Sequence, residues 1–202
     1  MSIPATVTIA VAYHSGFGHT ASQARAVGRG ARITGARAIL HDVTDLGESL
    51  WTALASADAI IFGSPTYMGS PSAAFQTFAE ASSAVWAGQG WRDKVAAGFT
   101  NSAGVNGDKL NTLTSFAILA AQHGMHWVSL GLPPGWLYSS TGSPHDLNRL
   151  GGFVGAMAQS PSDSGPDLAP AEADLRTAEH LGSRVAAVTA QLLAGRRSLV
   201  SA

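Results

Sequence analysis

The sequence predicts a doubly wound α/β fold, in which helices cover both faces of a parallel sheet. Three observations indicate this class. Short apolar segments alternate with amphipathic ones, the apolar segments are too uniformly apolar for a sheet with one wet face, and the loops that follow them are rich in glycine and hydroxyl side chains.

Five short segments have the composition of buried strands. Residues 7–13 (VTIAVAY) are almost continuously apolar, contain four β-branched residues and end at a glycine-bearing loop. The other predicted strands cover residues 36–41, 58–63, 94–100 and 125–130.

Amphipathic segments lie between and after these strands. In residues 20–32, Ala21, Ala24, Val27 and Ala31 recur at three- and four-residue spacing, the period of one helix face. The other predicted helices cover residues 46–56, 72–84, 109–123 and 170–193, with Pro170 suited to the first turn of the last helix and Gly195 to its end.

Length and charge limit the classes of function. A chain of 202 residues predicts a single domain, residues 1–202. Charged residues make up 12% of it, about half the ~25% usual for soluble domains, so we expect part of the surface to be covered in a homo-oligomer. A net charge of −1 argues against a nucleic-acid binder, which would carry a basic face.

The location of the protein follows from what the sequence lacks. There is no cysteine for a disulfide, a thiolate nucleophile or a cysteine-ligated zinc. The longest apolar run, residues 116–121, is far too short for a membrane span. Residues 1–4 lack the basic flank and apolar core of a signal peptide. We expect a cytoplasmic protein.

Residues 132–168 interrupt the alternation with a long segment rich in proline and glycine. A flexible linker is one interpretation. Trp136, Tyr138, Leu147 and Phe153 make the segment more apolar than a solvated coil. Since long loops within compact domains are usually functional, an ordered loop is the favoured interpretation.

The loop after the first strand, residues 14–20 (HSGFGHT), has the chemistry of a phosphate site. Glycines let the backbone turn its N–H groups inward, and the following helix adds partial positive charge. Ser15 and Thr20 add hydroxyl donors, but the loop has no lysine. A simple capped turn would need fewer of these features.

A second interpretation of this loop is a dinucleotide fingerprint. Gly16, Gly18 and Ala21 occupy its small positions, and Asp42 lies where a ribose-binding acid would stand. The choice therefore depends on the other loops at the same edge of the sheet, because ligands of open α/β sheets bind beyond the carboxyl ends of the strands.

Two further loops at that edge favour a flavin mononucleotide. Residues 63–71 (GSPTYMGSP) combine stiffening prolines with flat or polarisable surface at Tyr67 and Met68. Residues 100–108 (TNSAGVNGD) form a small polar loop ahead of a helix, where Asp108 could also act simply as a cap. Backbone N–H groups of such loops can stabilise a flavin edge on reduction.

Together, residues 13–20, 63–69, 99–102 and 122–125 resemble the flavodoxin-like NAD(P)H:quinone oxidoreductases of the WrbA type, in order and spacing. The likeness covers most of the chain. It implies a flavodoxin-like fold with five parallel strands in the order 2-1-3-4-5. It also implies FMN as cofactor, NADH or NADPH as electron donor, a small-molecule quinone as acceptor, and a homodimer or homotetramer.

The resemblance and the three loops together predict the residues that bind the cofactor: Ser15, Gly16, Phe17, Gly18, His19, Thr20, Pro65, Thr66, Tyr67, Met68, Gly69, Thr100, Asn101, Ser102, Ala103, Gly104 and Asn106. The resemblance also implies that Phe17 touches the nicotinamide nucleotide and that Trp86, Gln122 and His123 lie on the substrate side. Gln122 replaces a histidine that faces the flavin in the family, and Tyr67 replaces an arginine. His123 could instead favour the helix dipole.

The expected activity is two-electron reduction of quinones by NAD(P)H in a ping-pong mechanism, with FMN as the reactive centre and no catalytic side chain assigned. Histidine spacing predicts no metal site. A flavodoxin-type electron carrier, a Rossmann NAD(P)-dependent reductase and an interaction module without cofactor remain as alternatives.

Overall fold

The computed structural model describes residues 6–200, so the expectation for residues 1–4 lies outside the described residues. Its central sheet has the parallel order β2-β1-β3-β5-β6. In chain order this is the predicted 2-1-3-4-5 arrangement. The strands are β1 (Thr8–Tyr13), β2 (Arg37–Asp42), β3 (Ala59–Tyr67), β5 (Val95–Ser102) and β6 (His126–Trp127).

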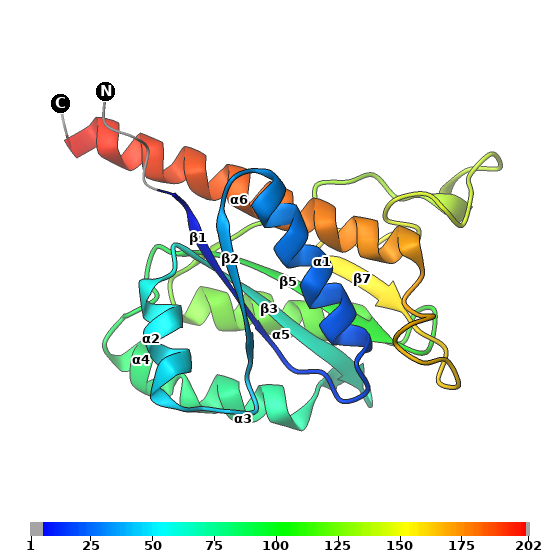
Figure 1. The fold of residues 1–202 in the computed structure, drawn as a ribbon, viewed down its shortest axis with the longest axis horizontal. Helices are drawn as coiled ribbons and strands as arrows, with labels where there is room; N and C mark the ends of the chain where they lie inside the picture. Colours follow the sequence, from blue (N-terminus) through cyan, green and yellow to red (C-terminus); the bar gives the residue numbers. More distant parts are fainter. Residues whose placement is uncertain (1–5, 201–202) are drawn as a thin grey trace.

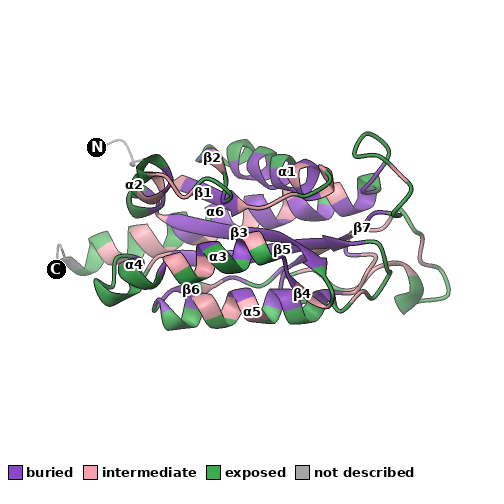
Figure 2. Cartoon of the chain, turned by 90° about the horizontal axis from the view of Figure 1, so that it is seen from below, coloured by how far each residue is buried: buried purple, intermediate pink, exposed green. Residues whose placement is uncertain are grey.

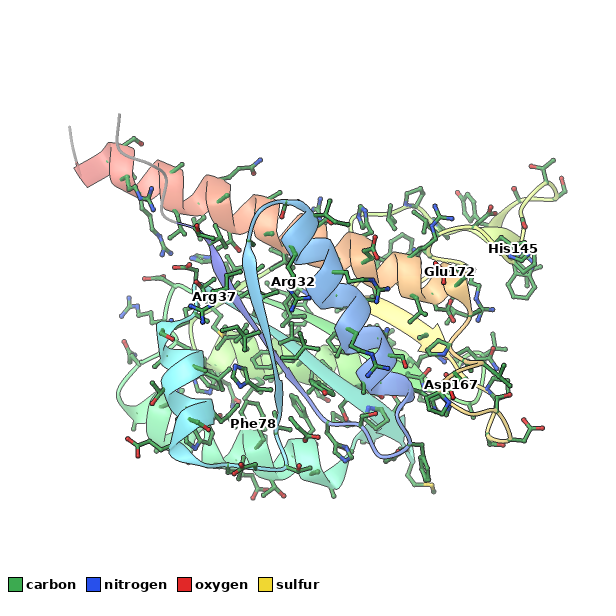
Figure 3. All side chains as sticks on the ribbon, in the orientation of Figure 1. Arg32, Arg37, Phe78, His145, Asp167 and Glu172 are labelled. Atoms are coloured by element: carbon green, nitrogen blue, oxygen red, sulfur yellow. The ribbon has the colours of Figure 1, made fainter. Side chains whose placement is uncertain are left out.

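Helices cover both faces of this sheet (Figure 1, Figure 2). Alternate residues of β1 point to opposite faces, and each set enters a separate apolar cluster. The first cluster packs under α1 and α6, and the second, which includes Phe78 (labelled in Figure 3), packs under α2, α3 and α5. The helices are α1 (His19–Ile33), α2 (Glu48–Ser56), α3 (Ala73–Ala81), α4 (Ser83–Ala87), α5 (Lys109–Gln122) and α6 (Glu172–Val200).

Glycines set the close packing of α1 against α6. A Cβ on Gly30 would lie 1.8 Å from the carbonyl oxygen of Glu179, and one on Gly182 would lie 2.0 Å from that of Val27. Neither distance is possible for real atoms, so only glycine allows the two backbones to meet here. None of the helices within residues 6–200 is long and apolar enough to cross a membrane.

The predicted strand over residues 125–130 is wrong in its length. β6 has only two residues and pairs with the amino end of β5. The chain turns away at Gly131 (φ +70°), and β7 (Ala156–Gln159) pairs with the carboxyl end of β5 instead. A Cβ on Gly155 would lie 2.2 Å from the carbonyl oxygen of Gly98, so the chain re-enters the sheet through a contact that only glycine permits.

Two further predictions need correction. The predicted helix over residues 72–84 is divided into α3 and α4, because the Ser82 hydroxyl donates to the Ala79 carbonyl at 2.7 Å and also contacts His123. The last helix continues through Gly195, where it was expected to end. Gly195 does not adopt the left-handed conformation of a C-terminal cap and instead continues the helix.

The loop over residues 63–71 also contains regular structure. β3 continues to Tyr67, and Thr66 and Tyr67 pair antiparallel with β4 (Ser70–Pro71). Met68 (φ +48°) and Gly69 (φ +78°) form the turn of this hairpin. The hairpin therefore extends the centre of the sheet beyond the other strand ends.

The segment between β6 and β7 forms an arm that projects from the body of the molecule (Figure 1). The arm contains η1 (Trp136–Tyr138). At its base the Asn148 N–H donates to the Thr177 hydroxyl at 2.8 Å, and the Asn148 side chain donates to the carbonyl of Pro133 at 3.2 Å. Its tip exposes Leu137 and Tyr138, which are 79% and 76% accessible.

Candidate functional site

A cavity of about 760 Å³ opens at the carboxyl ends of β3, β5 and β7, beside the start of α1. Its volume lies within the roughly 300–1,000 Å³ typical of small-molecule and cofactor sites. Four loops line it, and three of them are the loops that the sequence predicted. The lining residues are Phe17, His19, Thr20, Pro65, Thr66, Tyr67, Met68, Asn101, Ser102, Ala103, Ser160, Pro161, Ser162, Ser164, Gly165 and Pro166.

The first loop is held by the side chain of Ser15. Its Oγ accepts the N–H groups of Gly18 and Ala21, both at 3.1 Å. Gly18 has φ +88°, a left-handed conformation that favours glycine, and it precedes the first residue of α1. The Thr20 hydroxyl lines the cavity and has no hydrogen-bond partner within residues 6–200. A helix start and a free hydroxyl thus face the cavity together.

The second loop is anchored by a chain of buried hydroxyls. Thr66 Oγ1 lies 2.8 Å from Thr100 Oγ1 and donates to Thr112 Oγ1 at 2.8 Å. Thr100 in turn donates to the Ser64 carbonyl at 2.7 Å. These bonds fix the end of β3 against β5 and α5, so the hairpin that follows starts from a rigid base.

Flat and polarisable side chains gather at the cavity mouth. Phe17 and Tyr67 meet edge to face, with ring centroids 6.4 Å apart. Phe17 is 74% accessible, and Met68 is fully exposed at the hairpin turn. Partial burial raises the pKa of Tyr67 above its ordinary value, so this residue stays a neutral phenol. The mouth is an uncharged apolar surface that a ring system could contact.

The third loop leads from β5 into α5. Asn101, Ser102 and Ala103 line the cavity, and the predicted Asp108 cap forms no side-chain hydrogen bond to the helix. Instead the adjacent Lys109, which is fully buried, donates to Ser102 Oγ at 2.8 Å and to the carbonyl of Gly104 at 2.6 Å. Burial lowers the pKa of Lys109 to about 8.

The fourth wall, residues 160–166, belongs to the segment 132–168 that was expected to form an ordered loop, but its place beside the cavity was not predicted from the sequence. Asp167, labelled in Figure 3, follows this segment directly. The Ser160 hydroxyl donates to Asn101 Oδ1 at 2.9 Å, and the His19 Nε2 lies 2.9 Å from the Ser164 carbonyl. A Cβ on Gly18 would come within 3.0 Å of Pro166. The wall therefore closes against the first and third loops.

Sequence reasoning missed this wall because it missed β7. A strand at residues 156–159 would have placed the following loop at the same edge as the other three, and that loop is rich in serine, glycine and proline. The four-residue strand has the alternating burial of an outer strand, but it is too short to stand out in the sequence.

The predicted cofactor-binding residues fall into two groups. Ten of them line the cavity directly, from Phe17 to Ala103. The others lie in or directly beside the same loops without lining the cavity: Ser15, Gly16, Gly18, Gly69, Thr100, Gly104 and Asn106. Gly16 lies next to the site, since a Cβ there would come 2.5 Å from the Tyr67 hydroxyl.

Trp86, Gln122 and His123 lie elsewhere. They line a separate depression of about 300 Å³ that also includes Gly124. The Asp93 N–H, two residues before the start of β5, donates to the Gly124 carbonyl at 2.9 Å, whereas the cavity lies at the other end of that strand. Within one chain these three residues therefore do not share the cavity, and their substrate-side role stays a prediction.

His123 is a packed core residue in this structure. Its Nε2 lies 2.9 Å from the Ser82 hydroxyl, and its ring centroid lies 4.3 Å from that of Trp91. Burial lowers the pKa of His123, which favours the neutral ring. A neutral imidazole gives little support to the helix-dipole interpretation.

The cavity fits FMN in shape and chemistry. The free Thr20 hydroxyl and the start of α1 suit a phosphate, while Tyr67 and Met68 suit a flat ring. Gly107 (φ +55°) is required by the third loop itself, because a Cβ there would lie 2.1 Å from Ser102 Oγ. Asp42, the residue that the dinucleotide interpretation assigned to the ribose, accepts hydrogen bonds from Thr44 and does not line the cavity. The structure therefore gives no support to that interpretation.

Fold and site together define a flavodoxin-like α/β protein with a mononucleotide site beyond its strand ends. Residues 11–132 match the family described as NADPH-dependent FMN reductase. The chain belongs to this family of oxidoreductases, which confirms the predicted relationship and, with it, FMN and NAD(P)H as cofactors.

Individual relatives agree with this assignment. The chain is 44% identical to "Flavodoxin FldP" of Pseudomonas aeruginosa (strain UCBPP-PA14) over 182 residues, which cover 90% of this chain and 96% of that protein. It is 30% identical to an "NAD(P)H dehydrogenase (quinone)" of Geotalea uraniireducens (strain Rf4) over 206 residues, covering 91% and 98% of the two chains.

A solved structure supports the fold. The chain superposes on a flavodoxin described as a WrbA-like protein from Agrobacterium tumefaciens with a TM-score of 0.73 and 44% identity, covering 92% of this chain and 99% of that one. The predicted flavodoxin-like fold is confirmed.

Proposed function

We propose that this protein catalyses two-electron reduction of quinones by NAD(P)H in a ping-pong mechanism with bound FMN. The observation that carries the proposal is the open mouth of the cavity, where Phe17, Tyr67 and Met68 surround the predicted ring site without a charged side chain. A neutral apolar surface can contact either a nicotinamide ring or a quinone. The two reactants would bind to this one surface in turn, as a ping-pong mechanism requires.

The residues of the chain bind and orient the reactants. The start of α1, with Thr20, would hold the phosphate. Thr66 to Met68 would border one edge of the ring, and Asn101 to Ala103 would border another. When bound, FMN supplies a ring that accepts a hydride and passes it on. The hydrogen bonds of Thr66 to the hydroxyls of Thr100 and Thr112 keep this edge of the ring site rigid. A rigid edge would hold the ring and its reactant in line.

The test is an anaerobic titration of purified protein loaded with FMN. NADH or NADPH is added while the visible flavin band is followed, and benzoquinone is added afterwards. The proposal predicts bleaching and then full recovery, and the faster nucleotide identifies the preferred donor. Parallel double-reciprocal lines are expected in the steady state, and intersecting lines would count against one shared site.

A second candidate is an electron carrier, favoured by the 44% identity to a protein named flavodoxin. Such carriers usually meet their partners through acidic surfaces, and a net charge of −1 provides little steering of that kind. In the same titration a carrier would keep its flavin oxidised when NADH or NADPH is added.

We also propose that the protein acts in the cytoplasm as a homodimer or homotetramer. The low charge content and the exposed Leu137, Tyr138 and Phe153 of the arm support association with further copies of the chain. Light scattering coupled to gel filtration tests this, and a monomer of 20.6 kDa at micromolar concentration would contradict it.

A further inference from the structure

Lys109 is the most unusual charged residue of the site. It is the first residue of α5 and is fully buried, whereas lysine is almost never fully buried without a charged partner. Its ammonium donates to Ser102 Oγ at 2.8 Å and to the carbonyls of Gly104 at 2.6 Å and Val105 at 3.1 Å. All three of its hydrogen bonds therefore go to one loop.

These bonds determine the orientation of the loop peptides. A trans peptide holds its N–H opposite its carbonyl. Because the carbonyls of Gly104 and Val105 point to the ammonium, the N–H groups of Val105 and Asn106 point away from it. Neither N–H has a partner in the described part of the chain. Lys109 thus holds the carbonyls of this loop inward and fixes the loop behind the part of the cavity wall that Ser102 forms.

The charge of Lys109 is not balanced by a contact. The acid that faces it is Asp174 of α6, and both Asp174 oxygens bind Arg149 of the arm at 2.7 Å. β5 and β7 contribute only neutral groups here, among them Ser102 and Gln159. Asp108, the neighbour of Lys109 on α5, forms no ion pair with it. Lysine and arginine together exceed the single buried carboxylate by one positive charge.

An unbalanced buried cation is costly, and the cost falls when an anion binds nearby. Burial opposes the charge and lowers the pKa of Lys109 to about 8, although Asp174 acts in the other direction. The Ser102 hydroxyl that contacts the ammonium also lines the cavity. The positive charge therefore lies directly behind the cavity wall, where negative charge on a ligand would be favourable.

We propose that Lys109 is a positioning residue that makes the cavity bind reduced FMN more tightly than oxidised FMN. This inference rests on the proposed function. A hydride carries two electrons and one proton, so its transfer from NAD(P)H gives the ring one additional negative charge. The ammonium behind Ser102, a residue that lines the cavity, stabilises that charge.

The experiment compares the wild-type protein with K109M, which removes the charge and all three hydrogen bonds. Dissociation constants for oxidised FMN and two-electron potentials of bound FMN are measured by titration against reference dyes from pH 6 to 10. At pH 7 we expect K109M to lose at least about tenfold in the preference for reduced FMN, which corresponds to about 30 mV.

The sign of the pH dependence follows from the lowered pKa. Lys109 is charged below pH 8, so the difference in potential between the wild-type protein and K109M is complete there. It declines above pH 8, as the lysine of the oxidised state loses its proton. K109R keeps a charge at every pH and is expected to show the wild-type potential at pH 7 without this decline.

The matched control is K94M. Lys94 is partly buried and, like Lys109, is bound to backbone carbonyls, those of Ala55 and Ala57, but it stands at the amino end of β5. K94M should leave both the potential and its pH dependence unchanged. If K109M lowered the affinity for oxidised FMN and for reduced FMN by the same factor, Lys109 would only support the loop. This result would overturn the inference.

Two further outcomes separate this inference from the proposed function. Wild-type protein that binds FMN but shows no change in the pH slope above pH 8 overturns the role of Lys109, even if every variant fails to fold. Wild-type protein that shows the slope change but is not reduced by NADH or NADPH supports that role and rejects the proposed enzyme activity.

Discussion

The two ends of β5 are built from different chemistry. At its carboxyl end, glycines, hydroxyls and a buried lysine surround a cavity. At its amino end, aromatic rings pack against one another, with Trp91 fully buried against Trp51, Phe78 and His123. The amino end thus provides free energy of folding by apolar burial, and the carboxyl end gives up part of that burial for polar groups that can face a ligand.

The strongest test of this comparison is W91A at the amino end. Removing a fully buried indole from this cluster leaves a large cavity and should lower the free energy of unfolding by about 3–5 kcal/mol. Urea denaturation measures the loss. FMN affinity of the folded protein should stay within twofold, and W86A, at a half-exposed position, should change stability by less than about 0.5 kcal/mol.

At the carboxyl end, T66V should have a smaller effect on folding and a larger effect on the ligand. The isosteric valine leaves the hydroxyls of Thr100 and Thr112 without their shared partner, which costs about 1–3 kcal/mol. We expect FMN to bind about tenfold more weakly, as measured by flavin fluorescence. T112V removes only one of the two bonds and is the milder control. A T66V protein with unchanged FMN affinity would show that the hydroxyl chain serves stability alone.

The pH dependence of stability sharpens the comparison at His123. Burial lowers the pKa of this histidine in the folded state, so the unfolded chain binds the proton more readily. The stability from neutral His123 is therefore complete above the unfolded pKa of about 6.5 and declines as the pH falls below it, by at most about 1.4 kcal/mol per pH unit. H123Q should show a flatter profile between pH 5 and 7 in urea denaturation. Parallel profiles for H123Q and the wild-type protein would contradict the assignment of a neutral buried ring.

The smallest effect on stability is expected for M68A. Met68 is fully exposed at the hairpin turn, so its loss should change the free energy of unfolding by less than about 0.5 kcal/mol. The same change should raise the KM for quinone several-fold, because the side chain forms part of the cavity mouth. The control is I118A, which removes an exposed apolar side chain from α5 rather than from the hairpin. It tests whether the loss of any exposed apolar side chain changes the KM.

The amino-acid pattern predicted the centre of the molecule better than its margin. Apolar segments such as residues 58–63 are continuous enough to indicate a strand, and their order follows from the alternation with helices. The outer strand could not be predicted in the same way. Its two halves, β6 and β7, are short and stand far apart in sequence, and the pairing of β7 with β5 depends on the close contact of Gly155 with Gly98.

The site shows the same contrast. Three loops that directly follow predicted strands were found, because a loop at a known strand end has a known place. The wall at residues 160–166 follows a strand that was not predicted. Lys109 was missed for another reason: nothing in the local sequence shows that a lysine at a helix start folds back under the preceding loop, since its burial depends on α6 and the arm.

The arm between β6 and β7 has a consequence for redesign of the chain. The Leu130 N–H donates to the Phe153 carbonyl at 3.0 Å, so the two ends of the arm meet, and a short turn could join them without disturbing the sheet. Such a truncation would also remove Arg149, the hydrogen-bond partner of both Asp174 oxygens, and leave Lys109 as the cation that faces this buried carboxylate. A shortened chain would therefore have one positive charge less behind the cavity wall, so the length of the arm and the electrostatics of the site cannot be changed separately.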